Sequence, residues 1–409
     1  MLTWFFLQIS PPVPSAPDFT ERDLSAFRLL RRFRESLSAA QQAVADHPSF
    51  ADPKRRLLLG DYLSLFLFGL YNPVARTLRG LQFASHFPKV QKEVCSQPVS
   101  LGSFSDAQHL VDPAVLEHVF HDLLSQLPKT TNLLPPSLQN HQWMARDGSL
   151  FAALPRMAWA LYGGGHEDHV NNAVRLHLSF NLLKDAPAQA TITPGKICER
   201  ATLRADLEPG ASYIGDRYFG EHYGYFGQLT KAGCHYLIRL LENKAVVNVL
   251  EELPLSEADE AAGVKRQAIA TLGSKKSRSV PLRVIWFEGQ GGQVIMLATD
   301  LGVAQLSAAD ATLMYRHRWQ IEYFFRWVKC LMGCGHWMAE SERGATIQLY
   351  LALIGAVLLQ LDLGRRPTKR IWELMQWHQS GMLDEATVRK LLEKELRGPV
   401  KKRRATLLS

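Results

Sequence analysis

The sequence has few cysteines, and those present follow no regular spacing. Only five of its 409 residues are Cys, an odd number scattered between Cys95 and Cys334. A disulfide framework needs paired cysteines, so this pattern argues against a disulfide-stabilised scaffold and favours a reducing, cytoplasmic compartment. Cys330, Cys334 and His336 leave a zinc site open as an alternative, although three clustered ligands without a second pair match no ordinary zinc spacing.

Long apolar segments are also missing. The longest uninterrupted run, Leu349–Leu359, has eleven residues between two glutamines, whereas a helix that crosses a bilayer needs about 20. We therefore predict a buried core helix here and expect no membrane partner. The opening segment MLTWFFLQIS is apolar, but it has no basic region and no small-residue cleavage site, so no signal peptide is predicted.

Net positive charge is nearly absent over most of the chain and is concentrated near its C-terminus. The net charge is +8, and residues 364–409 hold twelve Lys/Arg against five Asp/Glu. That balance favours a polyanionic partner without proving one. A second basic segment, Arg28–Arg34, is as compatible with a solvated helix face as with a DNA contact.

The residue pattern divides the chain into five regions of a mixed α/β protein. Alternating segments such as RLHLSFNLL (175–183) and ASYIGD (211–216) predict strands, and the strand over WMARDGSLFAAL is expected to end or turn at Asp147-Gly148. Five further strands are predicted in succession between Cys234 and Leu301. The regions are a loose tail (1–20), a helical region suited to DNA-end binding (21–139), an α/β core (140–233 and 306–363), a β-rich insertion (234–305) and a basic helical region with a tail (364–409).

The segment YRHRWQIEYFFRWVKC, residues 315–330, is the most informative part of the sequence. On a single helix at about 100° per residue, Tyr315, Arg318, Glu322 and Lys329 fall on one narrow stripe, while the large apolar residues fall on the other side. The helix is therefore predicted to bury its apolar side and to present an acid, two bases and a phenol on the opposite side.

Three motifs in the chain resemble those of a known enzyme family. Tyr-x2-Arg-x3-Glu-x6-Lys, at residues 315–329, looks like the signature of the insertion-sequence transposases often called the IS-four family. GDRYFG (215–220) resembles the second motif of that family, and RDGSLF (146–151) resembles the first. The motifs occur in the family's order, the β-rich block lies between the second and the third, and the resemblance covers roughly residues 140 to 365.

The resemblance implies a ribonuclease-H-like catalytic core interrupted by a β-rich insertion, with helical N- and C-terminal regions. It further implies that Asp147, Asp216 and Glu322 are catalytic and hold two Mg²⁺ ions, with Mn²⁺ as a substitute. The expected partners are the transposon terminal inverted repeats and target DNA, bound by a homodimer when two ends are paired.

Basic and aromatic residues near the three acids are expected to contact DNA. Arg318 and Lys329 would hold phosphates, Tyr315 would donate to a phosphate or stack on a displaced base, and Arg217 would be a further contact or a salt-bridge partner.

Two other functions stay open beside strand transfer. One is a nuclease on the same core that hydrolyses DNA without joining ends, and the other is a decayed copy that only binds DNA. The complete set of acids weighs against the second, because a protein that only binds DNA has no need for carboxylates facing phosphate.

Overall fold

The computed structural model describes residues 27–43, 54, 56–128, 134–162, 171–274, 279–331 and 336–397. The predicted loose tail, Cys334 of the alternative zinc site and the basic run at 401–404 lie outside the described residues.

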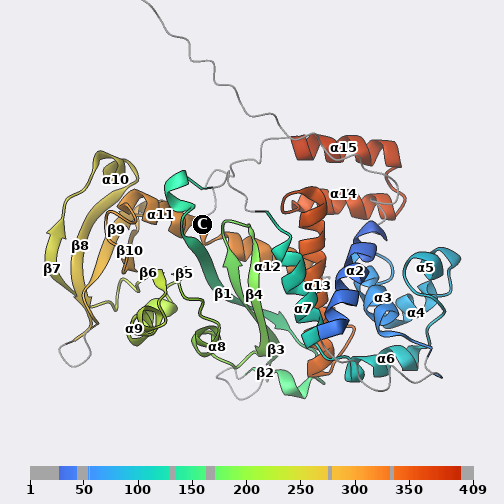
Figure 1. Cartoon of the computed structure of the whole chain (residues 1–409). Helices are drawn as coiled ribbons and strands as arrows, with labels where there is room; N and C mark the ends of the chain where they lie inside the picture. Colours follow the sequence, from blue (N-terminus) through green and yellow to red (C-terminus); the bar gives the residue numbers. More distant parts are fainter. Residues whose placement is uncertain are drawn as a thin grey trace, which may run out of the picture.

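One mixed sheet forms the centre of the molecule, as the alternating segments predicted (Figure 1). Its order is β2-β3-β1-β5-β6-β10-β9-β8-β7, and β4 pairs with β3 off this path. The strands are β1 (Gln142–Ala152), β2 (Leu161–Tyr162), β3 (Asn171–Asn181), β4 (Ala186–Pro194), β5 (Ala211–Gly215), β6 (His235–Arg239), β7 (Val247–Leu253), β8 (Val264–Leu272), β9 (Leu282–Glu288) and β10 (Val294–Thr299).

The strand directions separate two parts of the sheet. β1, β3 and β4 are antiparallel neighbours, whereas β5 pairs with β1, and β6 with β5, in parallel. The parallel strands are connected through helices, as parallel pairing requires. These are α8 (Glu199–Ala205) before β5 and α9 (Gly224–Lys231) between β5 and β6.

The strand β1 differs from its prediction in one respect. It does not end or turn at Asp147-Gly148 but continues for four more residues, to Ala152, because residues 144 to 152 all pair with β3. Cross-strand pairing therefore overrides the local tendency of an Asp-Gly pair to form a turn.

The block at 234–305, expected as an insertion, is continuous with the central sheet. Its first strand, β6, pairs with β5, and β10 pairs with β6, so β10, β9, β8 and β7 extend the same sheet to its edge. The short helix α10 (Glu257–Ala261) links β7 to β8. An expected boundary at residue 234 therefore does not coincide with any edge of the sheet.

Helices from the two ends of the chain share one core (Figure 1). The helix α13 (Glu342–Leu363) has 22 residues, twice the predicted apolar run, and 89% of its apolar window is buried. It contacts α2, α3, α6 and α7, and the Tyr71 hydroxyl donates to the Gly355 carbonyl at 2.7 Å. The N-terminal helices are α2 (Phe27–Ala43), α3 (Leu59–Tyr71), α4 (Leu78–Ala84), α5 (Pro88–Glu93), α6 (Leu101–Leu110) and α7 (Ala114–Ser125).

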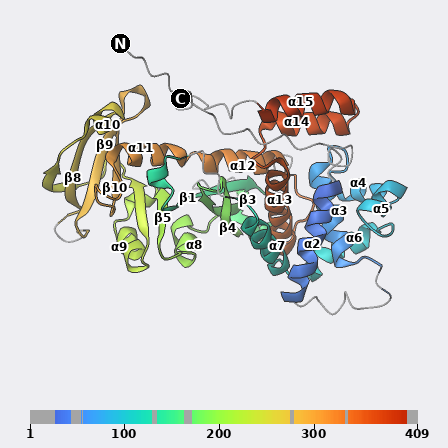
Figure 2. The same ribbon diagram turned by 45° about the horizontal axis from the view of Figure 1, so that its top comes forward.

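The last two described helices, α14 (Lys369–Gln379) and α15 (Glu385–Arg397), pack on this helical end of the molecule, as Figure 2 shows. The ring of Trp372 on α14 lies 5.6 Å from that of Trp327. The predicted helical C-terminal region is thus part of the packed structure through residue 397.

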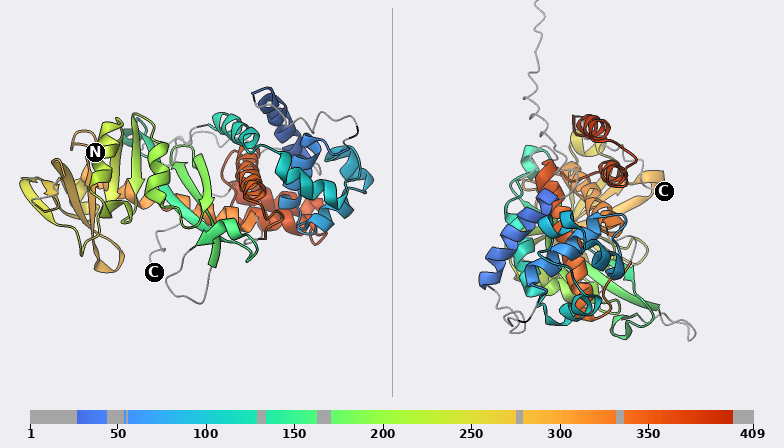
Figure 3. Two further views of the ribbon diagram at one scale, coloured as in Figure 1. Left: turned by 90° about the horizontal axis from the view of Figure 1, so that it is seen from below. Right: turned by 90° about the vertical axis from the view of Figure 1, so that its right-hand side faces the viewer.

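The segment predicted as one helix at 315–330 is two helices in line. α11 (Ala308–His317) ends at Arg318, and α12 (Gln320–Leu331) begins two residues later. Figure 2 shows the pair crossing from the β-rich end to α13, and Figure 3 shows how far apart these two ends lie. The β-rich end anchors α11, because the Asp259 carboxylate on α10 accepts from the Ala309 amide at 2.7 Å.

Candidate active site

Asp147 and Asp216 are brought level by the parallel pairing of β1 with β5. The last register pair is Ala145 with Ile214, so two residues further along each strand direction stand Asp147 and Asp216. Side chains alternate between the faces of a sheet, so both carboxyl groups belong to the face on which Ala145 and Ile214 pack in the large core.

The helix α12 covers that same face. It contacts β1, and Phe324 of α12 packs against Phe180 of β3 with ring centroids 5.5 Å apart. The first turn of α12 carries Glu322, on the side of the helix opposite its buried apolar residues. Asp147 lies in the middle of β1, and Asp216 directly follows β5. The third predicted acid therefore comes from the helix that packs over the first two.

Arg318 connects two of the three acids. Its guanidinium donates to the Glu322 carboxylate at 2.8 Å and lies 3.7 Å from the Asp147 carboxylate. The Arg318 side chain is only 6% exposed, whereas Asp147 and Glu322 retain 20% and 27%. The cation thus lies behind the carboxylates, and the carboxylates remain accessible from solvent.

The proton affinity of Asp147 reflects this crowded setting. Burial raises its pKa to about 7, the Arg318 guanidinium opposes the rise, and the negative charges of Asp216 and Glu199 add to it. The Gly148 amide donates to the Asp147 carboxylate at 2.8 Å, which also favours the charged form. On the neighbouring strand, the Tyr218 amide donates to Asp216 at 2.9 Å.

Two of the predicted DNA contacts have other partners in the structure. Tyr315 is buried, and its ring lies 6.3 Å from that of Phe287. Arg318 is buried against the acids. Both side chains are therefore covered in the structure, and their contact with DNA stays a prediction, because a helical wheel shows which residues share a face but not what covers that face.

The other two predicted contacts are accessible. Arg217 is exposed directly beside Asp216. Lys329 is half-buried, with its ammonium group 5.2 Å from the centre of the Phe151 ring at the end of β1. Both lie on segments that border the three acids.

Among the residues that the structure describes, no three His, Cys, Asp or Glu side chains stand close enough together to hold a metal ion. The Arg318 guanidinium lies next to two of the three acids. Cys330 is exposed on α12, and its partner in the alternative zinc site, Cys334, lies outside the described ranges.

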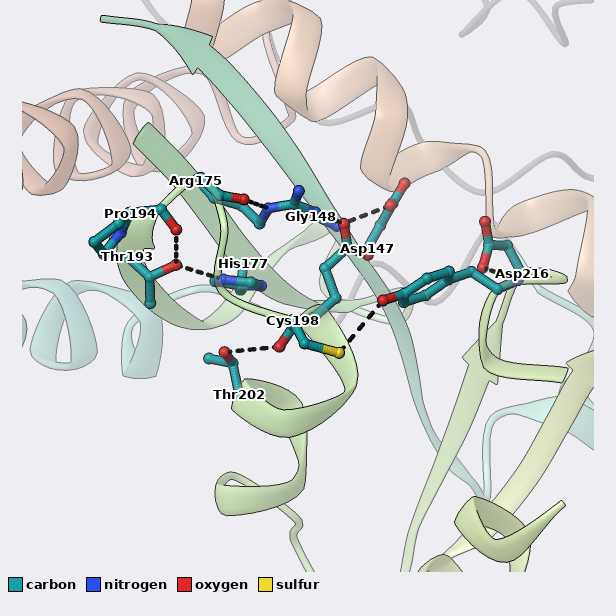
Figure 4. A network of polar contacts seen from close by, with 12 residues as sticks. Asp147, Gly148, Arg175, His177, Thr193, Pro194, Cys198, Thr202 and Asp216 are labelled. Carbon is teal, nitrogen blue, oxygen red and sulfur yellow. Dashed lines mark hydrogen bonds and ion pairs between the residues drawn. The ribbon is translucent and has the colours of Figure 1, made fainter. Parts of the chain in front are cut away.

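The sequence interpretation missed a second group of polar residues around the start of α8 (Figure 4). Glu199 forms an ion pair with Arg175 of β3. Burial alone would raise the pKa of the exposed Cys198 thiol, but hydrogen bonds from the Tyr218 hydroxyl, from backbone amides and from Arg200 lower it to about 7. No periodicity or motif in the sequence identifies these residues. The register of β1 with β3 and the position of α8 place Glu199 near Asp147.

Comparison with known proteins shows which family the sequence matches. The profile of the "Transposase DDE domain" matches residues 141–358. The chain is 26% identical over 192 residues to a protein of Sinorhizobium fredii named as transposase y4zB, covering 46% of this chain and 53% of the relative. It is 27% identical over 213 residues to one of Geobacillus stearothermophilus named as the transposase for insertion sequence element IS5377, covering 50% and 52%.

The chain spans about half the length of these curated relatives. Among solved structures, it is similar to the piggyBac transposase in a synaptic complex with hairpin DNA, with 8% identity, a TM-score of 0.42, and coverage of 93% of this chain and 82% of that one. Because the family profile extends over more than half of the sequence, the chain belongs to the transposase DDE domain family.

Proposed function

We propose that this protein is a metal-dependent DNA transposase that cleaves DNA at transposon ends and joins the freed 3′-hydroxyl to target DNA. One observation carries the proposal. Asp147 on β1 stands level with Asp216, the residue that directly follows the parallel strand β5, and α12 packs on β1 and carries Glu322. Three acids 69 and more residues apart in sequence are costly to assemble, which disfavours a purely architectural role.

The core is proposed to be ribonuclease-H-like. Its support is the strand arrangement β4-β3-β1-β5-β6, with three antiparallel strands followed by two parallel ones, and helices on both faces. The narrower assignment to the IS-four group rests on the spacing from Tyr315 to Lys329.

The residues present suit Mg²⁺ in their chemistry. Their donors are carboxylate oxygens, which Mg²⁺ prefers, and few protein ligands are needed because this ion keeps several waters. In this structure the guanidinium of Arg318 occupies the place of a positive charge among the acids. It is buried between Asp147 and Glu322, which indicates that these acids are arranged around positive charge. When bound, two divalent ions would stabilise the attacking and leaving oxygens of phosphodiester cleavage.

The chain's own residues would orient the reaction. Asp147, Asp216 and Glu322 would fix the position of the cations, and Arg318 would keep Glu322 turned toward Asp147 while it stays buried itself. Arg217 and Lys329, at the border of the site, would hold the phosphates on either side of the scissile bond. We further propose that two copies pair two terminal inverted repeats and that the protein acts in the cytoplasm.

The proposal is tested by Asp147→Asn, Asp216→Asn and Glu322→Gln, each with Glu257→Gln on the exposed start of α10 as a matched control. Each of the three changes should reduce strand cleavage at least about a hundredfold while leaving DNA binding intact, since a lost metal ligand costs several kcal/mol in the transition state. Near-normal cutting by any of them would remove that residue from the site.

Strand transfer is separated from simple hydrolysis by a second assay. A pre-cleaved end with a free 3′-hydroxyl should be joined to a plasmid target by the unaltered protein. Cleavage without joining would favour the alternative nuclease, and binding without either would favour a decayed copy.

A further inference from the structure

The face of β1 opposite Asp147 carries a second charged arrangement. Asp147 pairs with Leu178, which packs in the core beneath α12, so the next residue, Gly148, faces the other side of the sheet. On that side α8 contacts β1 and β3. The first turn of α8 places Glu199 directly against the backbone of Gly148.

The close approach of Glu199 depends on glycine. A Cβ atom added at Gly148 would lie 2.8 Å from the carboxyl carbon of Glu199, closer than real Cβ contacts come. The lack of a side chain at residue 148 therefore admits a carboxylate to the backbone next to Asp147. This is a physical reason for the glycine in the RDGSLF motif of this chain.

Arg175 holds Glu199 in this position. It stands on β3 opposite Leu150, forms an ion pair with Glu199, and donates through Nε to the Gly195 carbonyl at 3.1 Å. Only 16% of the Arg175 side chain and 14% of the Glu199 side chain are exposed. A paired, largely buried arrangement of this kind keeps a fixed geometry and is weakly screened.

The charge of Glu199 reaches the proposed catalytic acids. Its carboxylate is among the groups that raise the pKa of Asp147, and Asp216 in turn is among those that raise the pKa of Glu199. Glu199 thus lies within electrostatic range of two of the three acids, from the far side of the sheet, while Arg175 supplies the balancing charge.

We propose that Glu199, fixed by Arg175 against Gly148, is a positioning residue that strengthens cation binding at Asp147 and Asp216 from the opposite face of the sheet. This inference rests on the proposed function, because it assumes that divalent cations bind there. Glu199 acts through space and through the backbone of β1, and Arg175 limits the strength of its field.

The proposal predicts opposite effects for the two members of the ion pair. Glu199→Gln removes the anion and leaves an unpaired cation, so the affinity for Mn²⁺ should fall about three- to tenfold. Arg175→Gln leaves the anion uncompensated, so the affinity should rise by a similar factor. The double variant should bind close to the unaltered protein, and Gly148→Ala should act in the same direction as Glu199→Gln.

The measurement is a titration of the metal-free full-length protein with Mn²⁺, with free ion followed by electron paramagnetic resonance at low salt. Circular dichroism melting of every variant reports on folding separately, and Glu257→Gln is the control that should bind normally. Arg175→Lys, which keeps the charge, should leave the affinity near its original value even where Arg175→Gln melts at lower temperature.

The outcomes decide the proposal either way. Opposite shifts for Glu199→Gln and Arg175→Gln support it. Equal losses for both would indicate a purely structural ion pair, and unchanged affinities would indicate no influence on the cations, so each of these results overturns it. Asp147→Asn and Asp216→Asn are measured alongside. If the proposed function is wrong, these two variants should bind Mn²⁺ and cleave DNA normally. If only the role of Glu199 is wrong, both should still lose cation binding and cleavage.

Discussion

The guanidinium of Arg318 donates to the carboxylate of Glu322 at 2.8 Å, across the junction between α11 and α12. A buried cation in this place ties the helix that carries Glu322 to Asp147, in the middle of β1. We therefore expect a change at Arg318 to alter the free energy of unfolding before it alters DNA binding.

Replacing Arg318 by Gln should lower the free energy of unfolding of the metal-free protein by about 2–4 kcal/mol, because two carboxylates lose a buried counter-ion. Added Mg²⁺ should raise the melting temperature of the variant more than that of the original protein, since the ion takes over the missing charge. Thermal melts with and without Mg²⁺ provide the test. An unchanged stability together with a flatter salt dependence of DNA binding would instead indicate that Arg318 holds phosphate.

Lys329 is expected to contact a phosphate directly. Lys329→Ala should reduce the slope of log affinity against log salt by about one unit and weaken binding similarly for end-containing and random duplexes. The exposed Arg217 should behave alike when replaced by Ala. Fluorescence anisotropy across a salt series measures the slope, with Lys265→Ala in the β-rich end as the control. Slopes that do not change would exclude both residues from the interface.

Cys198 should react faster with iodoacetamide than Cys95 and Cys234, because it is exposed and its pKa is lowered to about 7, whereas the other two thiols are buried. The rate should rise with a midpoint near pH 7. Tyr218→Phe removes the hydroxyl that lies 3.3 Å from the thiol, so the midpoint should move upward. Peptide mapping by mass spectrometry identifies the labelled residue, and a midpoint that ignores Tyr218→Phe would contradict this account.

His177 should make the protein sensitive to acid. Its ring is fully buried and burial lowers its pKa to about 4, whereas an unfolded histidine titrates near 6.5. The unfolded state therefore binds the proton more readily between these values, and stability falls as pH decreases from about 6.5 to about 4, by roughly 3 kcal/mol in total. Urea unfolding at several pH values should show a shallower loss for His177→Asn. An equal loss in both proteins would assign the acid sensitivity to other groups.

The local sequence pattern was sufficient to predict most strands of the sheet, but it did not predict how side chains pack around the three acids. Alternating residues mark β7 to β10 within a few positions, because strand side chains repeat with a period of two whatever the strand's neighbours are. The burial of Arg318 and Tyr315 could not be predicted in this way. A helical wheel separates polar from apolar residues, but only the packing of α12 on β1 determines that the polar side faces carboxylates.

Contacts between segments far apart in the sequence could not be predicted either. Glu199 carries no motif, and its approach to Gly148 follows from the register of β1 with β3 and from the position of α8. The association of α13 with helices nearly 300 residues earlier likewise leaves no periodic trace in the sequence. The order of the three acidic motifs, in contrast, could be recognised from the residues alone.

The burial of α13 among α2, α3, α6 and α7 has a consequence for synthesis on the ribosome. Nearly every residue of α3 is buried, and much of its cover is made only when translation reaches residues 342–363. The helical end therefore cannot complete its fold as a separate early unit while the sheet is still being made. During that interval the nascent chain exposes an apolar surface, so we expect products terminated before residue 342 to aggregate or to be retained by chaperones.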